Sequence, residues 1–199
     1  MSDPALILAA GASSRFGTPK QRFCYRGTPL VLRAVHTAKQ AGLHPVVVVG
    51  AHRESVEDLL SPDIDRVFNP GWETGMASSI RSGVQYLIES SHPDRLLIIA
   101  CDQPEISADD LIRLHRAGGD DQLCAATYED VIGIPACFPA RYFDDLLELQ
   151  GDRGARELLR GSKYDVHRVP MPRAAFDIDT PGDLEHRDFE KPTPSGRSA

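Results

Sequence analysis

Three short and almost uninterrupted apolar runs do most to limit what this chain can fold into. Residues 5–9, 46–49 and 96–99 read ALILA, VVVV and LLII. Strands without polar alternation suit a sheet that is covered on both faces, as parallel sheets are. Between these runs, residues 29–40 and 76–88 carry apolar side chains at helical spacing. The alternation predicts an α/β fold in one domain, a mostly parallel sheet with helices on both faces and right-handed crossovers.

The rest of the chain continues this alternation. Ser107, with Asp110 three positions later, predicts a capping box at the start of one helix. The domain is expected to cover residues 1–189, and residues 190–199 are expected to form a disordered tail because they lack apolar side chains before the last one. Further strands are expected at residues 65–68, 122–127, 131–138 and 166–169, and further helices at 53–60, 107–114, 141–149, 153–159 and after Pro181.

Composition excludes several classes of protein. The 199 residues carry a formal net charge of −7, whereas a general nucleic-acid binder is basic. No apolar run approaches the roughly 18 residues of a membrane span, and the one near the N-terminus is too short for a secretory signal. No pair of cysteines is spaced C-x-x-C and no histidine stands at zinc-ligand spacing, so we expect a reducing, cytoplasmic compartment and no catalytic cysteine. The cysteines are Cys24, Cys101, Cys124 and Cys137.

The loop after the first apolar run is the most specific functional signal. Residues 11–20 read GASSRFGTPK, so Arg15 and Lys20 stand among glycines and hydroxyl residues. Such a loop brings backbone N–H groups and positive charge to a polyphosphate, at the strand end where open α/β sheets bind ligands. It is not a P-loop, because Thr18 and Pro19 separate the second glycine from Lys20. The simpler alternative is a polar, solvated connection.

Carboxylates follow two other predicted strands or extended segments. Asp102 comes directly after the run that ends at residue 100, and Asp177 and Asp179 stand on either side of Ile178. Mg²⁺ takes one or two carboxylates together with water and phosphate oxygens, so Asp102 with Asp179 or Asp177 is a candidate metal site. In the alternative interpretation Asp102 begins a turn and Thr180 is the N-cap of a helix.

A third segment, residues 69–79, reads NPGWETGMASS and opens the predicted helix at 76–88. A helix N-terminus binds anions through its free N–H groups. The same segment could hold a base or a ribose, or be an ordinary helix entry.

In order along the chain, these motifs resemble those of the molybdenum cofactor cytidylyltransferases, within the broader MobA-like group of single-domain nucleotidyltransferases. The resemblance runs from residue 6 to about residue 184 and implies a Rossmann-like fold of the nucleotide-diphospho-sugar-transferase type. The matching motifs are LAAGASSRFGTPK at residues 8–20, NPGWETGMASS at 69–79, CDQP at 101–104, GIPA at 133–136, GDRGAR at 151–156 and DIDTPGD at 177–183.

The resemblance implies a reaction and a set of site residues. CMP would pass from CTP to the terminal phosphate of molybdopterin, with release of pyrophosphate and with Mg²⁺ or, in its place, Mn²⁺. Ala10 stands where guanylyltransferases carry glycine, which favours cytidine, and residues 133–136 and 151–156 would face the pterin. The implied catalytic residues are Arg15, Lys20 and Asp102, the metal ligands Asp102 and Asp179, with Asp177 as the alternative, and the nucleotide-binding residues Leu8, Ala9, Ala10, Gly11, Arg15, Lys20, Gly75, Met76 and Ser78.

The chemistry agrees with the lack of a histidine or cysteine base in these motifs. A phosphate monoester is ionised at neutral pH, its second pKa being about 6, so it can attack the α-phosphorus without a base. Positioning and electrostatics then do most of the catalysis. We expect a monomer or weak dimer that passes its product to a molybdenum hydroxylase. The alternatives are transfer to another small phosphate ester, or a non-catalytic chaperone that binds and delivers molybdopterin.

Overall fold

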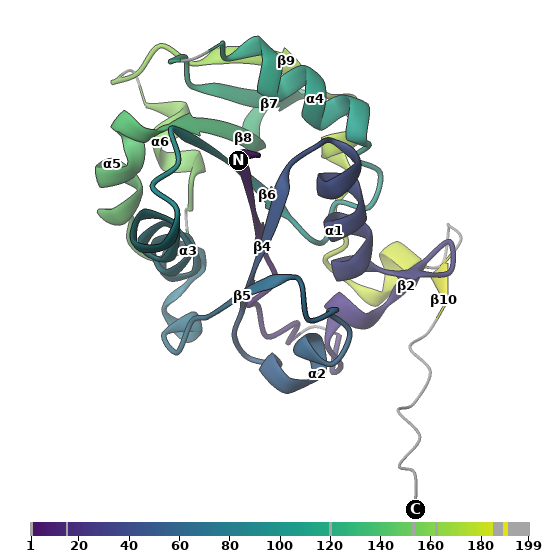
Figure 1. Cartoon of the computed structure of the whole chain (residues 1–199). Helices are drawn as coiled ribbons and strands as arrows, with labels where there is room; N and C mark the ends of the chain where they lie inside the picture. The colour runs from purple at the N-terminus through teal and green to yellow at the C-terminus, as the bar shows by residue number, and fades with distance from the viewer. Residues whose placement is uncertain are drawn as a thin grey trace, which may run out of the picture.

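The computed structural model describes residues 2–14, 16–119, 121–152, 154–161, 163–184 and 189–190. At its centre is a seven-stranded sheet in the order β5-β4-β1-β6-β8-β7-β9 (Figure 1). The pairs β5–β4, β4–β1, β1–β6 and β7–β9 are parallel, and β8 runs antiparallel to β6 and β7. The mostly parallel sheet is therefore confirmed. Its strands are β1 (Pro4–Leu8), β4 (His44–Val49), β5 (Asp65–Phe68), β6 (Arg95–Ala100), β7 (Cys124–Tyr128), β8 (Val131–Pro139) and β9 (His167–Pro170).

Helices cover both faces of the sheet, as expected. In Figure 1, α3 and α5 lie on one side of the central strands and α1 and α4 on the other. Leu6 and Leu8 of β1 pack in the core on the α3 side, while Ala5 and Ile7 pack on the α1 side. A strand with two buried faces needs no polar alternation, which explains the first apolar run. The helices are α1 (Leu30–Gln40), α2 (Arg53–Glu57), α3 (Met76–Ser90), α4 (Ala108–Ala117), α5 (Phe143–Leu147) and α6 (Arg156–Arg160).

The predicted capping box is present at the start of α4. The Ser107 hydroxyl accepts the Asp110 N–H at 3.2 Å, and the Asp110 carboxylate accepts the Ser107 N–H at 3.1 Å. Two N–H groups that the helix itself cannot satisfy are thereby bonded.

Several predicted helices differ from the observed ones. Where a helix was expected after Pro181, the described residues form a 3₁₀ turn over Pro181–Leu184, and residues 185–188 lie outside the described part. The Asp183 carboxylate accepts the N–H groups of Asp179 and Thr180 at the start of this turn. α2 ends at Glu57, and the expected helix at 141–149 is a 3₁₀ turn followed by the shorter α5.

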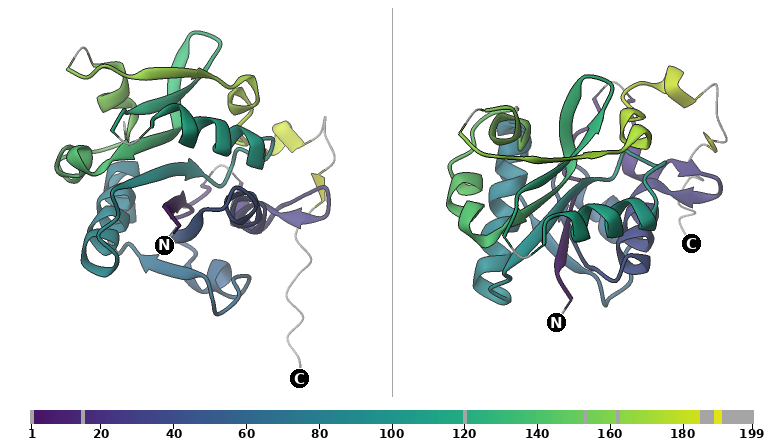
Figure 2. Two further views of the ribbon diagram at one scale, coloured as in Figure 1. Left: turned by 45° about the horizontal axis from the view of Figure 1, so that its top comes forward. Right: turned by 90° about the horizontal axis from the view of Figure 1, so that it is seen from above.

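A second sheet is found that the sequence did not predict. Strands β2 (Cys24–Tyr25), β3 (Thr28–Pro29) and β10 (Phe189–Glu190) pair in the order β10-β2-β3. In the views of Figure 2, the last described segments in yellow lie beside the early β2 region in purple. Residue 190 thus belongs to a strand, and the rest of the expected tail, residues 191–199, lies outside the described residues. No helix in the described part of the chain is long and apolar enough to cross a membrane.

Candidate active site

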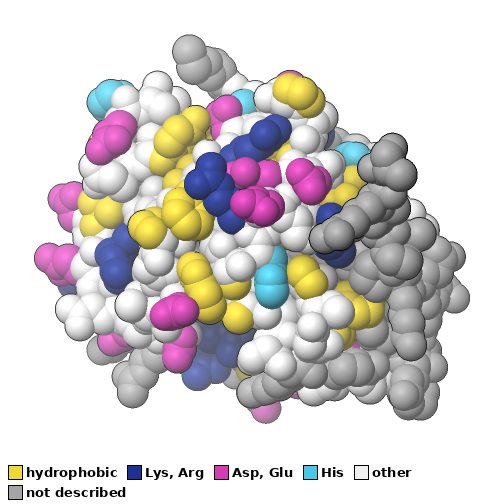
Figure 3. All heavy atoms as spheres, turned by 90° about the horizontal axis from the view of Figure 1, so that it is seen from below, with side chains coloured by type: hydrophobic (Ala, Val, Ile, Leu, Met, Phe, Trp, Pro, Cys, Tyr) yellow, Lys and Arg dark blue, Asp and Glu magenta, His cyan; other side chains and the backbone are white. Residues whose placement is uncertain are grey.

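A cavity of about 720 Å³ lies at the carboxyl ends of the central strands. This is the edge at which open α/β sheets bind their ligands. Figure 3 looks onto this edge, where acidic and basic side chains lie directly beside one another near the centre of the face. Most of the predicted site residues line the cavity. Its lining includes Leu8, Ala9, Ala10, Gly11, Lys20, Gln21, Trp72, Gly75, Met76, Ser79, Cys101, Asp102, Gln103, Ile134, Asp152, Ala155, Arg156, Asp177 and Asp179.

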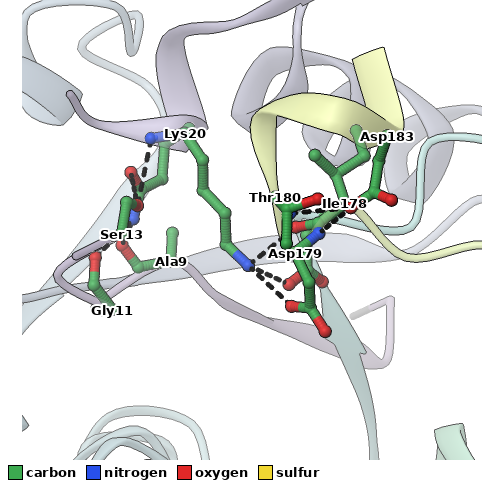
Figure 4. A network of polar contacts seen from close by, with 10 residues as sticks. Ala9, Gly11, Ser13, Lys20, Ile178, Asp179, Thr180 and Asp183 are labelled. Carbon is green, nitrogen blue, oxygen red and sulfur yellow. Dashed lines mark hydrogen bonds and ion pairs between the residues drawn. The ribbon is translucent and has the colours of Figure 1, made fainter. Parts of the chain in front are cut away.

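Lys20 lies between the carboxylates of two chain segments. Its Nζ is 2.5 Å from Asp102 Oδ2 and 3.8 Å from Asp179 Oδ1, and it donates to the Ile178 carbonyl at 3.1 Å. Figure 4 shows the Lys20 side chain extending from the Ser13 side of the loop toward Ile178 and Asp179. Burial lowers the pKa of Lys20, whereas the charge of Asp102 and its hydrogen bond raise it. The combined rise is larger than the lowering, so the pKa of Lys20 lies above its ordinary value. The ammonium group is therefore charged at neutral pH.

The segment that carries Asp177 and Asp179 is held beside Asp102, just after the end of β6. Its Ile178 is fully buried in a small cluster with Phe23, Tyr25 and Leu30, and the Ile178 N–H donates to the Asp102 carbonyl at 3.0 Å. Desolvation, together with the charges of Asp179 and Asp102, raises the pKa of Asp177 above its ordinary value. These contacts join two segments that are far apart in the sequence into one acidic group around Lys20.

The acidic group fits a hard divalent cation. Asp102 and Asp179 offer carboxylate oxygens, and both already lie within ion-pair distance of one positive charge, that of Lys20. Within the described residues no three histidine, cysteine, aspartate or glutamate side chains are grouped to hold a metal by themselves. Mg²⁺ commonly takes only one or two carboxylates from a protein and completes its shell with water and phosphate oxygens.

The entry to α3 meets Gly151, Asp152 and Gly154. Gly75 has φ +105°, and a Cβ there would lie 2.4 Å from Asp152 Oδ1 and 2.6 Å from the Gly151 carbonyl oxygen. The Ala77 N–H donates to that same carbonyl at 3.0 Å. Met76, whose side chain is 44% exposed, lies beside Gly154. Only a glycine at position 75 allows the two segments to approach this closely.

Ser78, expected among the nucleotide-binding residues, is not among the residues that line the cavity. It is buried, and its hydroxyl is bonded to the Asn69 amide at 2.8 Å and donates to the Gly71 carbonyl at 2.9 Å. The residue therefore stabilises the turn before α3, and its neighbour Ser79 lines the cavity. Arg15, the other expected triphosphate ligand, lies outside the described residues.

Sequence reasoning missed several cavity residues. Trp72 and Arg156 stand within motifs that were recognised, but nothing in their spacing marked them individually. The Arg156 guanidinium donates to the Tyr128 hydroxyl at 3.1 Å, a contact between two distant segments that no local pattern reveals.

Three of the cysteines, Cys101, Cys124 and Cys137, are buried. Burial raises the pKa of Cys101 and Cys137 to about 12 and that of Cys124 to about 11. Thiols with such pKa values stay protonated at neutral pH and are poor nucleophiles.

Comparison with known proteins decides the family. Residues 5–169 match the MobA-like NTP transferase domain. The chain belongs to the MobA-like NTP transferase family. It is therefore a nucleotidyltransferase, and the fold and family expected from its motifs are confirmed.

Relatives of this MobA-like transferase carry different names. It is 30% identical to the purine catabolism protein PucB of Bacillus subtilis over 93% of this chain and 97% of that protein. It is 28% identical to a probable molybdenum cofactor guanylyltransferase of Nostoc over 98% of each chain. The crystal structure of Rv0371c from Mycobacterium tuberculosis superimposes with a TM-score of 0.81 at 27% identity, over 92% of this chain and 95% of that one. A further structure of Rv0371c is a complex with manganese.

Proposed function

We propose that this nucleotidyltransferase moves CMP from CTP onto the terminal phosphate of molybdopterin and releases pyrophosphate. The observation that carries the proposal is one cavity that joins two groups of residues. Lys20, Asp102 and the loop after β1 line it together with Ile134 and Arg156. By resemblance the first group faces the nucleotide and the second the pterin, so donor and acceptor would share a single space.

The reaction needs two anions to meet. An oxygen of the acceptor phosphate attacks the α-phosphorus, a new P–O bond forms, and the bond to the β-phosphate oxygen breaks so that pyrophosphate leaves. Lys20 has three N–H donors, of which two are used by Asp102 and Ile178, so one is available for a phosphate oxygen. Its positive charge would stabilise the charge that develops on the leaving pyrophosphate.

Asp102 and Asp179 would hold the divalent cation, which when bound would neutralise phosphate charge and orient the phosphate oxygens. Mg²⁺ or Mn²⁺ would serve, and the manganese complex of Rv0371c supports a divalent-cation requirement. Asp183 would keep Asp179 in place, because its carboxylate accepts the Asp179 N–H at 3.0 Å. Arg156, positioned by Tyr128, would face the acceptor.

Selection of cytosine is proposed to depend on Ala10. A Cβ placed on Gly50 would lie 2.8 Å from both Ala10 Cβ and Trp72 Cβ, so the side chains of these two residues start from the same corner of the cavity. The Ala10 methyl group narrows that corner, which suits a pyrimidine better than a purine. We also propose a cytoplasmic monomer or weak dimer that delivers its product to a molybdenum hydroxylase.

The Ala10→Gly variant tests the selection of the base. Its ratio of kcat/KM for GTP to kcat/KM for CTP should rise about tenfold, since one methyl group in a pocket discriminates by about that factor or more. Steady-state pyrophosphate release with each nucleotide measures the ratio. Ala12→Gly, the same change two positions along the loop, should leave it unaltered. An unchanged ratio in Ala10→Gly would remove Ala10 from nucleotide selection.

The sole tryptophan provides a direct readout of nucleotide binding. Trp72 is the one tryptophan of the chain and lines the cavity, so its fluorescence should change when a nucleotide binds. Titration with CTP, GTP and ATP in the presence of Mg²⁺ gives a dissociation constant for each.

A further inference from the structure

The loop after β1 is held in place through its carbonyl oxygens. The Gln21 side-chain amide donates to the carbonyl oxygens of Ala9 and Gly11, each at 2.9 Å. His52 Nε2 lies 2.7 Å from the Ala12 carbonyl oxygen, and since a carbonyl only accepts, Nε2 carries the proton. The Ala51 N–H donates to the Ala10 carbonyl at 3.1 Å. Four consecutive carbonyl groups are thus bonded to other parts of the protein.

The N–H groups of the same loop are in the opposite situation. In the described part of the chain, the backbone N–H groups of residues 10–14 donate no hydrogen bond to another protein group. A peptide unit is planar and trans, so its C=O and N–H point in opposite directions. Each N–H group of residues 10–13 therefore points away from the group that bonds the carbonyl of the same peptide unit.

The loop borders the cavity. Ala9, Ala10, Gly11 and Ala12 all line it, and so does Lys20. A row of free N–H groups beside a lysine ammonium is suited to the oxygens of a polyphosphate, because an array of backbone N–H groups in a turn binds anions. The side chains that bond the loop carbonyls therefore control how these N–H groups are oriented.

We propose that Gln21 and His52 are positioning residues that hold the nucleotide loop in its anion-binding conformation. The inference rests on the proposed function in that the ligand is a nucleoside triphosphate. Neither residue needs to touch the reacting atoms. Gln21 is 1% exposed and belongs to the 3₁₀ turn Lys20–Arg22, while His52 follows β4 and does not line the cavity. The loop is thus held between two separate elements of the fold.

His52 gives the cleaner test, because it is only partly buried and acts only through Ala12. His52→Ala should weaken the binding of inorganic tripolyphosphate and of CTP with Mg²⁺ by about tenfold, the effect of losing one hydrogen bond of about 1.4 kcal/mol. The KM for CTP should rise by a similar factor with little change in kcat, since the interaction is the same in the ground and transition states. His52→Gln, which can still donate from a similar position, should recover most of the affinity.

The matched control is His44→Ala. His44 pairs with Asp65 at 2.8 Å, and it stands at the first residue of β4, the end away from the cavity. Its removal should leave tripolyphosphate binding unchanged. Gln21→Met, which keeps the bulk and removes the donor, should weaken binding as His52→Ala does, and thermal unfolding checks that each variant is folded.

Calorimetric titration with tripolyphosphate and with CTP separates the possible results. Wild-type affinity in His52→Ala, or an equal loss in His52→Gln, overturns the positioning role. If the wild type binds tripolyphosphate but not CTP, and His52→Ala weakens that binding, the positioning role holds and the proposed nucleotide is wrong. If the wild type binds neither compound, both proposals are overturned.

Discussion

In the described structure, Lys20 shares its one positive charge between two carboxylates. It bonds to Asp102 and lies within ion-pair distance of Asp179, and Asp177 lines the same cavity. A triphosphate that enters therefore meets more negative than positive charge from these residues. Opposite charge must come with the nucleotide, as a divalent cation, or from Arg15, which lies outside the described residues. At the scale of single residues, this charge balance supports the proposed binding of a metal–nucleotide complex.

Replacement of Lys20 tests its role toward the leaving group. Lys20→Ala should lower kcat by about 10²–10³-fold, the range found when one preorganised charge-stabilising donor is lost. The KM for CTP should change much less, since negative charge on the leaving pyrophosphate grows toward the transition state. Initial rates of pyrophosphate release give both constants. Lys39→Ala, which removes an exposed pair with Asp63, is the control. Unchanged turnover in Lys20→Ala would exclude the assignment.

At the scale of secondary-structure elements, the shape of the site depends on the turn that leads into α3. The entry of α3 packs closely against Gly151 and Asp152 at Gly75, and the buried Ser78 bonds that entry to Asn69. These contacts are local in space, and they link the motif at residues 69–79 to the motif at residues 151–156. Their loss should change the shape of the cavity more than the stability of the sheet.

The Gly75→Ala variant tests whether the close packing at the start of α3 is needed for activity. The added Cβ would overlap Asp152 and Gly151 and would also require a positive φ, so we expect a large loss of activity and some loss of stability. Gly42→Ala also falls at a positive φ, +76°, but has open space around it, and should cost only about 1–2 kcal/mol. Activity and urea unfolding of both variants compare the two effects. Equal activities would show that the contact with residues 151–154 is not required.

The capping box of α4 predicts a pH-dependent contribution to stability. Burial raises the pKa of Asp110, but hydrogen bonds from Ser107 and the charge of Arg173 lower it more, so the net pKa lies below its ordinary value. The ionised carboxylate therefore stabilises the native state above the unfolded pKa of about 3.9, and this contribution is lost as pH falls through the lower native value.

We expect Asp110→Asn to lower the free energy of unfolding by about 1 kcal/mol at pH 7, and by less below pH 3. Denaturant unfolding at the two pH values measures the difference. A loss that is equal at both would show that the charge of Asp110 does not contribute.

At the scale of the whole molecule, much of the fold could be predicted from local patterns. The apolar runs of β1, β4 and β6 predict buried parallel strands, because short runs without polar alternation suit a strand that is covered on both faces. The loop after β1 and Asp102 could be assigned to one sheet edge, since the carboxyl ends of parallel strands meet there. The strand assignment and the shared sheet edge both follow from local sequence patterns and from the order of strands and helices along the chain.

Contacts between distant segments could not be predicted in this way. Lys20 and Ile178 are 158 positions apart, and no periodic pattern in the sequence predicts their hydrogen bond. The strands β2, β3 and β10 have two residues each, too few for any pattern. Gln21 and His52 act through backbone carbonyls, for which any donor of suitable length would serve, so their residue types carry little signal.

The most direct test of the proposed function is the release of pyrophosphate from CTP in the presence of molybdopterin and Mg²⁺, with mass spectrometry of the product. We predict one pyrophosphate for each molybdopterin that gains CMP, no release after metal chelation, recovery with Mn²⁺, and none from the Asp102→Asn variant. Release from CTP only with another phosphate ester would contradict the proposed acceptor. No pyrophosphate from CTP, GTP or ATP with any acceptor would contradict catalysis itself and would favour a carrier of molybdopterin.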